Sequence, residues 1–429
     1  MNRLEKLSKP SLYRNSKEIS LGGIPYSMRD ILISAPLIAE LNEYLVGETG
    51  EGKTQLANEI IGYFGKKQSC IMEGRPDFNP NELLKSLNLG KLKEVKSDKE
   101  LIELTENVNK LFYYVDELNR CPPIVMNYFF NFFDGKLIHN GEVLKLGKKD
   151  YSLGFASGNI GDGAYVGVSD TDRALKDRMH MIIKLDDPEF CTTEEDDQKI
   201  FSGNKGSKAR LPASGTECLD NIFSLHDDFG KKEVPLILSV LGVYFHKGLD
   251  YLENTKRHSK RAIVDTWPNA KDIKTDTDEG LILPFSKRAV LSSIALTSAL
   301  EMIANENGNK VENSTNLFLD ALKFTIPYSG VLSRDYVKLQ CDGDVYSAFD
   351  SIMEKIKEDI NSKKIDLETA IAYAGEYGTL DESSLNRISP INSEGKWKPV
   401  RRAIEGIAKN PRLKKEDFNE LKTKYKSPN

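Results

Sequence analysis

The sequence predicts an α/β protein in which a core built on a parallel sheet is followed by mostly helical segments. Over residues 21–190, short apolar, strand-like runs alternate with helical patterns. A glycine-rich motif lies between one such run and a helix, and a later apolar run ends in two adjacent acidic residues. This alternation is typical of βαβ units, in which parallel strands are covered on both faces by helices.

The predicted strands of this sheet are residues 41–46, 69–73, 111–115, 151–157 and 180–185. Residues 81–111 are predicted to be mostly helical, and a second helix is expected to begin at the Pro122-Pro123 pair and to end at Gly135. In residues 137–146, Asn140-Gly141 separates two alternating segments, which predicts a β-hairpin.

The glycine-rich motif has the pattern of a phosphate-binding loop. Its glycines let the backbone curl so that successive N–H groups converge on phosphate oxygens, and the following helix adds the positive end of its dipole. Lys53 is expected to reach the β- and γ-phosphates, and Thr54 to offer its hydroxyl to Mg²⁺. The predicted nucleotide-binding segment is Gly47, Glu48, Thr49, Gly50, Glu51, Gly52, Lys53 and Thr54.

A second acidic element complements this loop. The apolar run 111–115 leads directly into Asp116 and Glu117. At the carboxyl end of a buried strand, Asp116 is expected to hold Mg²⁺ through water. Glu117 is then expected to lie near the γ-phosphate and to polarise the attacking water.

The composition limits the other function classes. The formal charge of −5 gives no global basic footprint for nucleic acid, and the scattered cysteines without C-x-x-C spacing argue against a disulfide framework or a zinc site. No apolar run approaches the roughly 18 residues of a membrane span, and a signal peptide is not recognisable. We therefore expect a cytoplasmic protein, with residues 1–20 as a tail or docking arm to which the sequence assigns no chemistry.

The acidic pair continues into the stretch DELNRCPPIVMNYFFNFFDGKLIHNGEVLKL, which resembles the MoxR-like group of AAA+ ATPases. The resemblance covers about residues 25–340 and implies an AAA+ P-loop NTPase core. It assigns Asn159 to the sensor-1 position, which holds the lytic water. Arg178 falls on the arginine-finger position, with Arg173 as a second candidate, and Arg288 falls on sensor 2, where it could act in cis or in trans.

The resemblance also orders the chain into segments. We expect an N-terminal tail at 1–20, an AAA+ core at 21–190, an insertion or connection at 191–233, a helical lid at 234–340 and an extra C-terminal helical segment at 341–429.

The resemblance implies Mg²⁺-dependent ATP hydrolysis by a hexameric ring of identical subunits, acting as a chaperone-like motor on a client protein. That client could be a partner with a von Willebrand factor type A domain. The alternative is a nucleic-acid motor or a McrB-like restriction NTPase using GTP or ATP, since the Asp-Glu-Leu-Asn-Arg stretch occurs there too. A module that only binds nucleotide is disfavoured, because both the catalytic acid and the finger are present.

Overall fold

The protein is described by a computed structural model that divides into two compact units. Unit 1 comprises Met1–Lys232 and Ala295–Val311, and unit 2 comprises Glu233–Ile294 and Glu312–Asn429. The residues that the structure describes are 3–7, 12–77, 85–87, 102–139, 142–159, 173–203, 206, 208–210, 218–252, 259–263, 267, 278, 280–377, 391 and 395–408.

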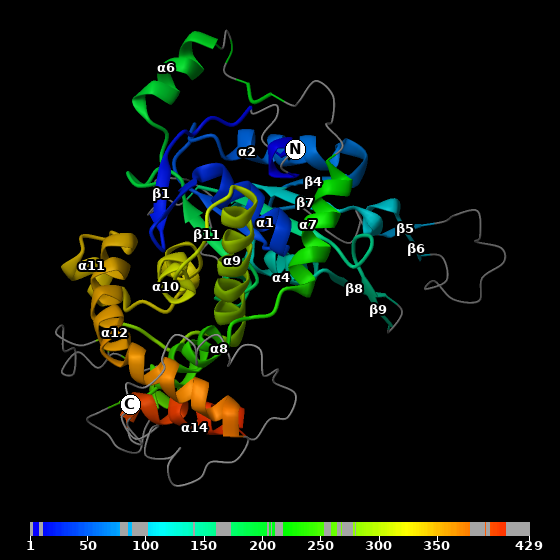
Figure 1. The fold of residues 1–429 in the computed structure, drawn as a ribbon. Coiled ribbons are helices and arrows are strands. Elements are labelled where there is room, and N and C mark those ends of the chain that lie inside the picture. Colours follow the sequence, from blue (N-terminus) through cyan, green and yellow to red (C-terminus); the bar gives the residue numbers. More distant parts are fainter. Residues whose placement is uncertain are drawn as a thin grey trace. The chain divides into compact units, whose positions relative to one another are not determined.

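Unit 1 is built on a five-stranded sheet in the order β11-β3-β10-β7-β4, and every neighbouring pair runs parallel (Figure 1). The strands are β3 (Glu43–Val46), β4 (Ser69–Glu73), β7 (Phe112–Asp116), β10 (Leu153–Gly158) and β11 (Met181–Lys184). All five predicted strands are confirmed. Every residue of β3 and β10 is buried, as expected of central strands covered on both faces.

Helices surround this sheet (Figure 1). The described helices of unit 1 are α1 (Ala35–Ala39), α2 (Lys53–Phe64), α4 (Pro123–Phe133), α5 (Arg173–Lys176), α6 (Glu194–Gly203) and α7 (Leu219–Lys231), together with the last part of α9 (Lys287–Glu306). The predicted helix start at the proline pair is confirmed by α4. Three of its aromatic side chains, Phe129, Phe132 and Phe133, are buried, so this face of the helix packs into the core.

Within the described residues, three two-stranded antiparallel pairs accompany the sheet. The predicted pairing is confirmed for β8 (Lys136–His139) with β9 (Glu142–Lys145), whose connecting residues lie outside the described part. β5 (Lys85–Leu87) pairs with β6 (Ile102–Leu104), so the helical prediction for 81–111 is wrong at these residues. β1 (Glu18–Leu21) pairs with β2 (Ile24–Ser27) through Gly22 and Gly23, both at positive φ. A Gly-Gly pair is a signal for such a turn.

Residues 191–233 contain helices α6 and α7. The acidic cluster at the start of α6 caps that helix. The Thr193 hydroxyl accepts a hydrogen bond from the Asp196 N–H (3.2 Å) and donates one to the Asp196 carboxylate (2.9 Å). This is a capping box, which satisfies backbone donors in the first turn.

Unit 2 is helical. It contains α8 (Leu236–Val243), α10 (Ser314–Thr325), α11 (Arg334–Gln340), α12 (Val345–Tyr377) and α14 (Lys398–Ala408), with the first part of α9 (Lys287–Glu306). Phe245 stacks on Phe285 and meets Phe318 edge-on in its core, and Tyr244 packs against Trp397. The boundary at residue 340 stays a prediction, and this apolar core includes side chains from both sides of it.

No helix among the described residues is both long enough and apolar enough to cross a membrane.

Candidate functional site

The phosphate-binding loop connects β3 to α2. Gly47, Gly50 and Gly52 have φ values of 141°, 100° and 81°, which residues with a side chain rarely adopt. Gly47 is also crowded, because a Cβ placed on it would lie 2.4 Å from Asp186 Oδ1. The loop therefore has the curled backbone that the sequence predicts, and α2 begins directly after it at Lys53.

Lys53 points into the curve of this loop. Its ammonium donates hydrogen bonds to the backbone oxygens of Gly47 (2.8 Å) and Glu48 (2.5 Å), and the side chain is largely buried. Burial lowers the pKa of Lys53, while Asp186 and Glu51 oppose that decrease. The ammonium is thus held in the loop and surrounded by acidic groups.

The acidic pair lies at the carboxyl end of β7. Asp116 accepts a hydrogen bond from the hydroxyl of Ser157 on the neighbouring strand β10. The Tyr114 hydroxyl lies 3.4 Å from the same Ser157 oxygen and also interacts with Asp116 and Thr54. These contacts connect Asp116 and Thr54, although the two residues come from distant parts of the chain.

Thr54, Asp116 and Tyr114 bring oxygen atoms together at this point. Oxygen donors are the ligands that a hard cation such as Mg²⁺ prefers, so the residues present fit the predicted metal. Thr54 and Asp116 would hold it. A bound Mg²⁺ would supply positive charge beside the phosphates.

Glu117 adopts a left-handed backbone, with φ of 52°. Its N–H donates to the Ser157 hydroxyl (3.2 Å), and its carboxylate pairs with Arg120 Nη2 (2.8 Å). Burial raises the pKa of Glu117, and the Arg120 guanidinium opposes this increase. The carboxylate is partly exposed. It is therefore held in place at the strand end and can still accept a proton from water.

Asn159 is buried and follows β10 directly. Gly158 of β10 is level with Val46 of β3, so Asn159 lies beside the start of the phosphate-binding loop. Its backbone oxygen accepts a hydrogen bond from the Asn119 side chain, which comes from the turn after β7. The ends of β3, β7 and β10 thus place three predicted site elements along one edge of the sheet.

Arg178 lies at the opposite edge. Its backbone oxygen accepts a hydrogen bond from Asn42, which directly precedes β3, whereas the phosphate-binding loop follows the end of β3. The guanidinium donates to Asp134 (3.1 Å), the residue after α4. Arg178 is therefore separated from Lys53 of its own chain by the length of β3. The side chain of Arg173 lies outside the described residues.

Arg288 belongs to unit 2, in the first turn of α9. Ser286 accepts a hydrogen bond from the Ala289 N–H (2.9 Å), so its hydroxyl caps this helix. The Arg288 backbone oxygen accepts from the Ser292 hydroxyl (2.9 Å). Because the phosphate-binding loop is in unit 1, the assignment of Arg288 to sensor 2 stays a prediction.

Sequence reasoning missed three residues of the site, namely Gly74, Ser157 and Asp186. A Cβ on Gly74 would lie 2.2 Å from the Glu117 backbone oxygen, and the Gly74 N–H donates to the Asp116 backbone oxygen (2.6 Å). Asp186 Oδ1 is buried beside Gly47 and has no hydrogen-bond partner among the described residues. All three residues lie at or just after the carboxyl end of a strand. These ends meet at one edge of a parallel sheet, so their positions in the sequence could have indicated that they belong to the site.

Comparisons with known proteins bear on the family and on the fold. Residues 43–179 match the family described as AAA domain (dynein-related subfamily). A crystal structure at 2.00 Å resolution of a candidate ATPase from Cytophaga hutchinsonii is similar, with a TM-score of 0.53 and 14% sequence identity. The likeness covers 83% of this chain and 92% of that one, and at this identity it concerns the fold. Among the curated proteins, none matches this chain.

Proposed function

We propose that this chain, whose fold is that of an AAA+ P-loop NTPase and whose family match supports an ATPase, is a ring-forming motor that remodels or activates a client protein. The reaction is the Mg²⁺-dependent hydrolysis of ATP. The observation that carries the proposal is the meeting of the phosphate-binding loop, Asp116, Glu117 and Asn159 at one edge of the sheet.

The chemistry follows from these groups. The N–H groups of the loop and the Lys53 ammonium bind the phosphates and offset their negative charge. Glu117 takes the proton of the attacking water, and Asn159 helps to orient that water. Burial raises the pKa of Glu117, which makes its carboxylate a stronger base for the proton of the attacking water.

The position of Arg178 supports a shared site. A guanidinium stabilises charge on the transferring phosphoryl group, but Arg178 lies a strand's length from the loop of its own subunit. In a head-to-tail ring, the same residue reaches the site of the neighbour. We therefore propose that the ring is a hexamer, as in the resembling AAA+ proteins, and that Arg178 acts in trans.

The MoxR-like resemblance supports a protein client, possible clients including von Willebrand factor type A domain proteins. The matching family is described as dynein-related, so the MoxR-like subgroup is our proposal and rests on the segment from Asp116 to Leu146. A chaperone-like role requires that hydrolysis change the conformation of the subunits and that this change act on the client.

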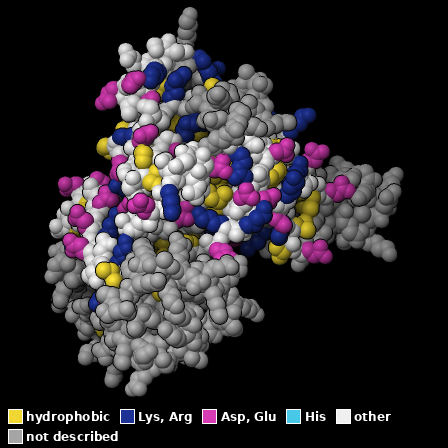
Figure 2. Space-filling model, viewed as in Figure 1, with side chains coloured by type: hydrophobic (Ala, Val, Ile, Leu, Met, Phe, Trp, Pro, Cys, Tyr) yellow, Lys and Arg dark blue, Asp and Glu magenta, His cyan; other side chains and the backbone are white. Residues whose placement is uncertain are grey.

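The alternative is a nucleic-acid motor or a McrB-like restriction NTPase, favoured by the Asp-Glu-Leu-Asn-Arg stretch. Such a protein needs cationic surface for phosphates. Among the described residues on the face in Figure 2, Lys and Arg side chains are interspersed with Asp and Glu. With a formal charge of −5, this mixture favours a protein client.

Phosphate release from the purified protein tests the proposal. ATP and GTP are compared over a range of protein concentrations, with Lys53→Ala as the inactive control. We expect turnover per subunit to rise with concentration for ATP and to vanish in the variant. Turnover that persists in Lys53→Ala would contradict the proposed site. Stimulation by DNA that weakens steeply with added salt would favour the alternative.

A further inference from the structure

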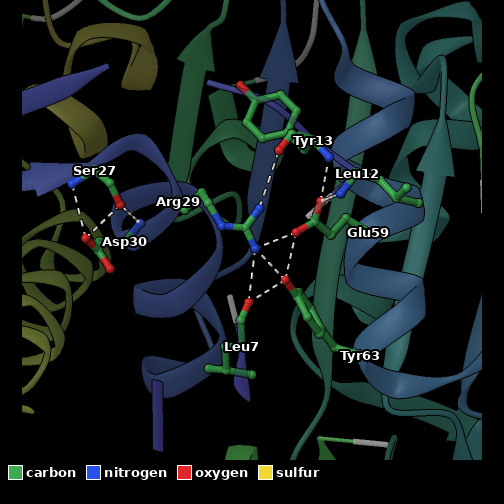
Figure 3. Close-up of polar contacts among 8 residues, drawn as sticks. All are labelled: Leu7, Leu12, Tyr13, Ser27, Arg29, Asp30, Glu59 and Tyr63. Atoms are coloured by element: carbon green, nitrogen blue, oxygen red, sulfur yellow. Dashed lines mark hydrogen bonds and ion pairs between the residues drawn. The ribbon is translucent and has the colours of Figure 1, made fainter. Parts of the chain in front are cut away.

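Residues 12–17, here called the N-terminal arm, are bound to the helix that follows the phosphate-binding loop. The backbone N–H groups of Leu12 and Tyr13 both donate to Glu59 Oε2 of α2, at 2.8 and 2.6 Å (Figure 3). The Glu59 side chain is only 1% exposed. A carboxylate this deeply buried requires several donors to offset the loss of hydration.

Arg29 supplies the balancing charge. Its guanidinium lies 2.5 Å from Glu59 Oε1 and 2.6 Å from the Tyr63 hydroxyl, which is itself 2.7 Å from Glu59 Oε1 (Figure 3). The same guanidinium donates to the backbone oxygens of Leu7 (3.0 Å) and Tyr13 (3.5 Å). Arg29 therefore connects α2 to the backbone of two N-terminal segments.

The helical turn that carries Arg29 is itself capped. The Ser27 hydroxyl accepts from the Asp30 N–H (3.2 Å), while the Asp30 carboxylate accepts from the Ser27 N–H (3.1 Å) and hydroxyl (2.7 Å) (Figure 3). This reciprocal pair fixes the backbone on both sides of Arg29.

The arm places Tyr13 against the phosphate-binding loop. A Cβ on Gly52, at the start of α2, would lie 3.3 Å from Tyr13 Cε2, so the ring borders the backbone of this glycine. The Tyr13 side chain is buried, and burial raises its pKa to about 12. Its hydroxyl is therefore protonated at neutral pH, and the ring contacts the loop as a neutral group.

Beyond Tyr13, the arm is bound to the segment that follows β11. The Asn15 amide donates to the Phe190 backbone oxygen (2.8 Å), and the Ser16 N–H and hydroxyl donate to Asp196 Oδ2 (2.7 and 2.8 Å). Lys17 donates to the Pro188 backbone oxygen. The arm thus joins α2 to the segment after β11, and both border the phosphate-binding loop.

We propose that Glu59 and Arg29 are positioning residues for nucleotide binding, which fasten the N-terminal arm so that Tyr13 braces the phosphate-binding loop at Gly52. The left-handed turn at Gly52 aims the N–H groups of the loop and of the first turn of α2. A ring packed on this turn reduces the number of backbone conformations that the loop samples before nucleotide binds. The loop then loses less conformational entropy when nucleotide binds, so binding is tighter.

This inference rests on the proposed function only in requiring that the loop bind nucleotide. The test measures the affinity of the full-length protein for a fluorescent ATP analogue. Glu59→Gln removes the charge and keeps the shape. Glu301→Gln is the matched control, because Glu301 is also buried and pairs with Lys232 at 2.5 Å in unit 1. Tyr13→Ala removes the brace, and Tyr13→Phe keeps its ring.

We expect Glu59→Gln and Tyr13→Ala each to weaken analogue binding at least tenfold, or about 1.4 kcal/mol. Glu301→Gln and Tyr13→Phe should stay within about twofold of the parent, since neither removes the brace. The double variant Glu59→Gln/Tyr13→Ala should bind no more weakly than the weaker single variant, because both changes remove the same contact.

Hydrogen exchange at the Leu12 and Tyr13 amides gives a second readout. Glu59→Gln should speed their exchange, because their acceptor loses its charge. The coupling must be reciprocal: if the bound conformation of the arm strengthens nucleotide binding, then bound nucleotide must stabilise that conformation. The ATP analogue should therefore slow exchange of these amides in the parent. Unchanged exchange with the analogue bound would contradict the coupling.

Several results would overturn the inference. These are analogue affinity of Glu59→Gln within twofold of the parent, equal weakening in Glu301→Gln, or fully additive losses in the double variant. If Glu59→Gln does not fold, the comparison of Tyr13→Ala with Tyr13→Phe decides. Lys53→Ala separates the two proposals. If Lys53→Ala still binds the analogue, the proposed nucleotide site is wrong. If Lys53→Ala loses analogue binding but Glu59→Gln keeps it, only the role of the N-terminal arm is wrong.

Discussion

Glu117 carries its side chain on a left-handed backbone, which costs a residue other than glycine about 1–3 kcal/mol. Two neighbours fix this conformation. The Ser157 hydroxyl accepts from the Glu117 N–H, and the Glu117 backbone oxygen fits closely against Gly74. The backbone conformation therefore directs the carboxylate to the edge of the sheet at which the phosphate-binding loop begins.

Glu117→Gln should retain nucleotide binding and lose most of the turnover. The amide keeps the shape of the side chain but cannot take the proton of the attacking water. We expect nucleotide affinity close to that of the parent and a turnover lower by roughly 10²–10⁴-fold, the usual contribution of a general base. Phosphate release and equilibrium nucleotide binding, measured on the same preparation, check both parts. Parent-like turnover would exclude Glu117 as the base.

Gly74→Ala should damage the site without touching an acidic side chain. The added Cβ would lie 2.2 Å from the Glu117 backbone oxygen and 3.0 Å from that of Asp116, and backbone atoms cannot rotate away. We expect unfolding to become easier by about 1–3 kcal/mol and turnover to fall, because the strand end must shift.

Gly230→Ala is the control for this prediction, because a Cβ there meets nothing within 4 Å and Gly230 lies in α7. Alanine in a helix should be neutral or stabilising by roughly 0.5–1 kcal/mol. Thermal melting and phosphate release of the two variants are compared. Equal effects of the two changes would rule out crowding at Gly74 as the cause.

The sequence could predict the polar residues of the site but not the residues that support them. Lys53, Asp116 and Asn159 each follow a recognisable apolar run, and the ends of parallel strands meet at one edge. Gly74 and Ser157 act through contacts between strands that are far apart in sequence. Their roles depend on strand order and register, which local patterns do not determine.

At the scale of secondary structure, long apolar runs were predictable and short paired segments were not. The sequence predicts all five strands of the sheet, because each is a short, mostly apolar run. β5 and β6 were mistaken for helix, because each is a short strand whose only described sheet partner is the other. Two local signals were not used: the Gly-Gly turn between β1 and β2, at the start of the predicted core, and the capping box of α6, in the segment interpreted as an insertion or connection.

β3 contains a buried acid that should make stability depend on pH. Glu43 is 1% exposed, and neither carboxylate oxygen has a hydrogen-bond partner among the described residues. Burial raises the pKa of Glu43 well above its usual value of 4.5. The unfolded chain then releases this proton at lower pH than the folded protein. The contribution of Glu43 to stability is therefore most favourable below pH 4.5 and decreases as pH rises toward the folded pKa.

Glu43→Met replaces this acid by an apolar side chain of similar length. We expect the variant to melt at higher temperature than the parent, with a difference that grows as pH rises above 4.5 toward the folded pKa of Glu43, because the unfolded parent loses its proton before the folded parent does. Melting curves of both proteins across this range measure it. A difference that does not change with pH would mean that Glu43 titrates alike in both states.

At the scale of the whole molecule, the proposed function places the catalytic site between two subunits. Asn42 contacts Arg178 at one edge of the sheet, and Lys53 follows the other edge. The parallel arrangement of β3 and β11 therefore separates Arg178 from the phosphate-binding loop of its own chain. If two subunits form each site, hydrolysis depends on assembly. A protein with a complete site in each subunit would not show this dependence.

Mixing two inactive variants tests this composite site. Arg178→Ala should bind nucleotide and lose hydrolysis, and Glu117→Gln should do the same for a different reason. If Arg178 acts in trans, an equal mixture restores sites in which an Arg178→Ala subunit receives the arginine of a Glu117→Gln neighbour. Random assembly of a head-to-tail ring makes about a quarter of the sites complete, so we expect about a quarter of parent turnover.

The control for mixing pairs Lys53→Ala with Glu117→Gln. Both residues belong to the same side of the site, since Lys53 follows β3 and Glu117 follows β7 of one sheet. Every site in this mixture carries one defect, so its turnover should stay at the level of the separate variants. If the Arg178→Ala mixture also stays inactive while mixed assemblies are seen in sedimentation, Arg178 does not act across the interface and the ring mechanism proposed for this chain is wrong.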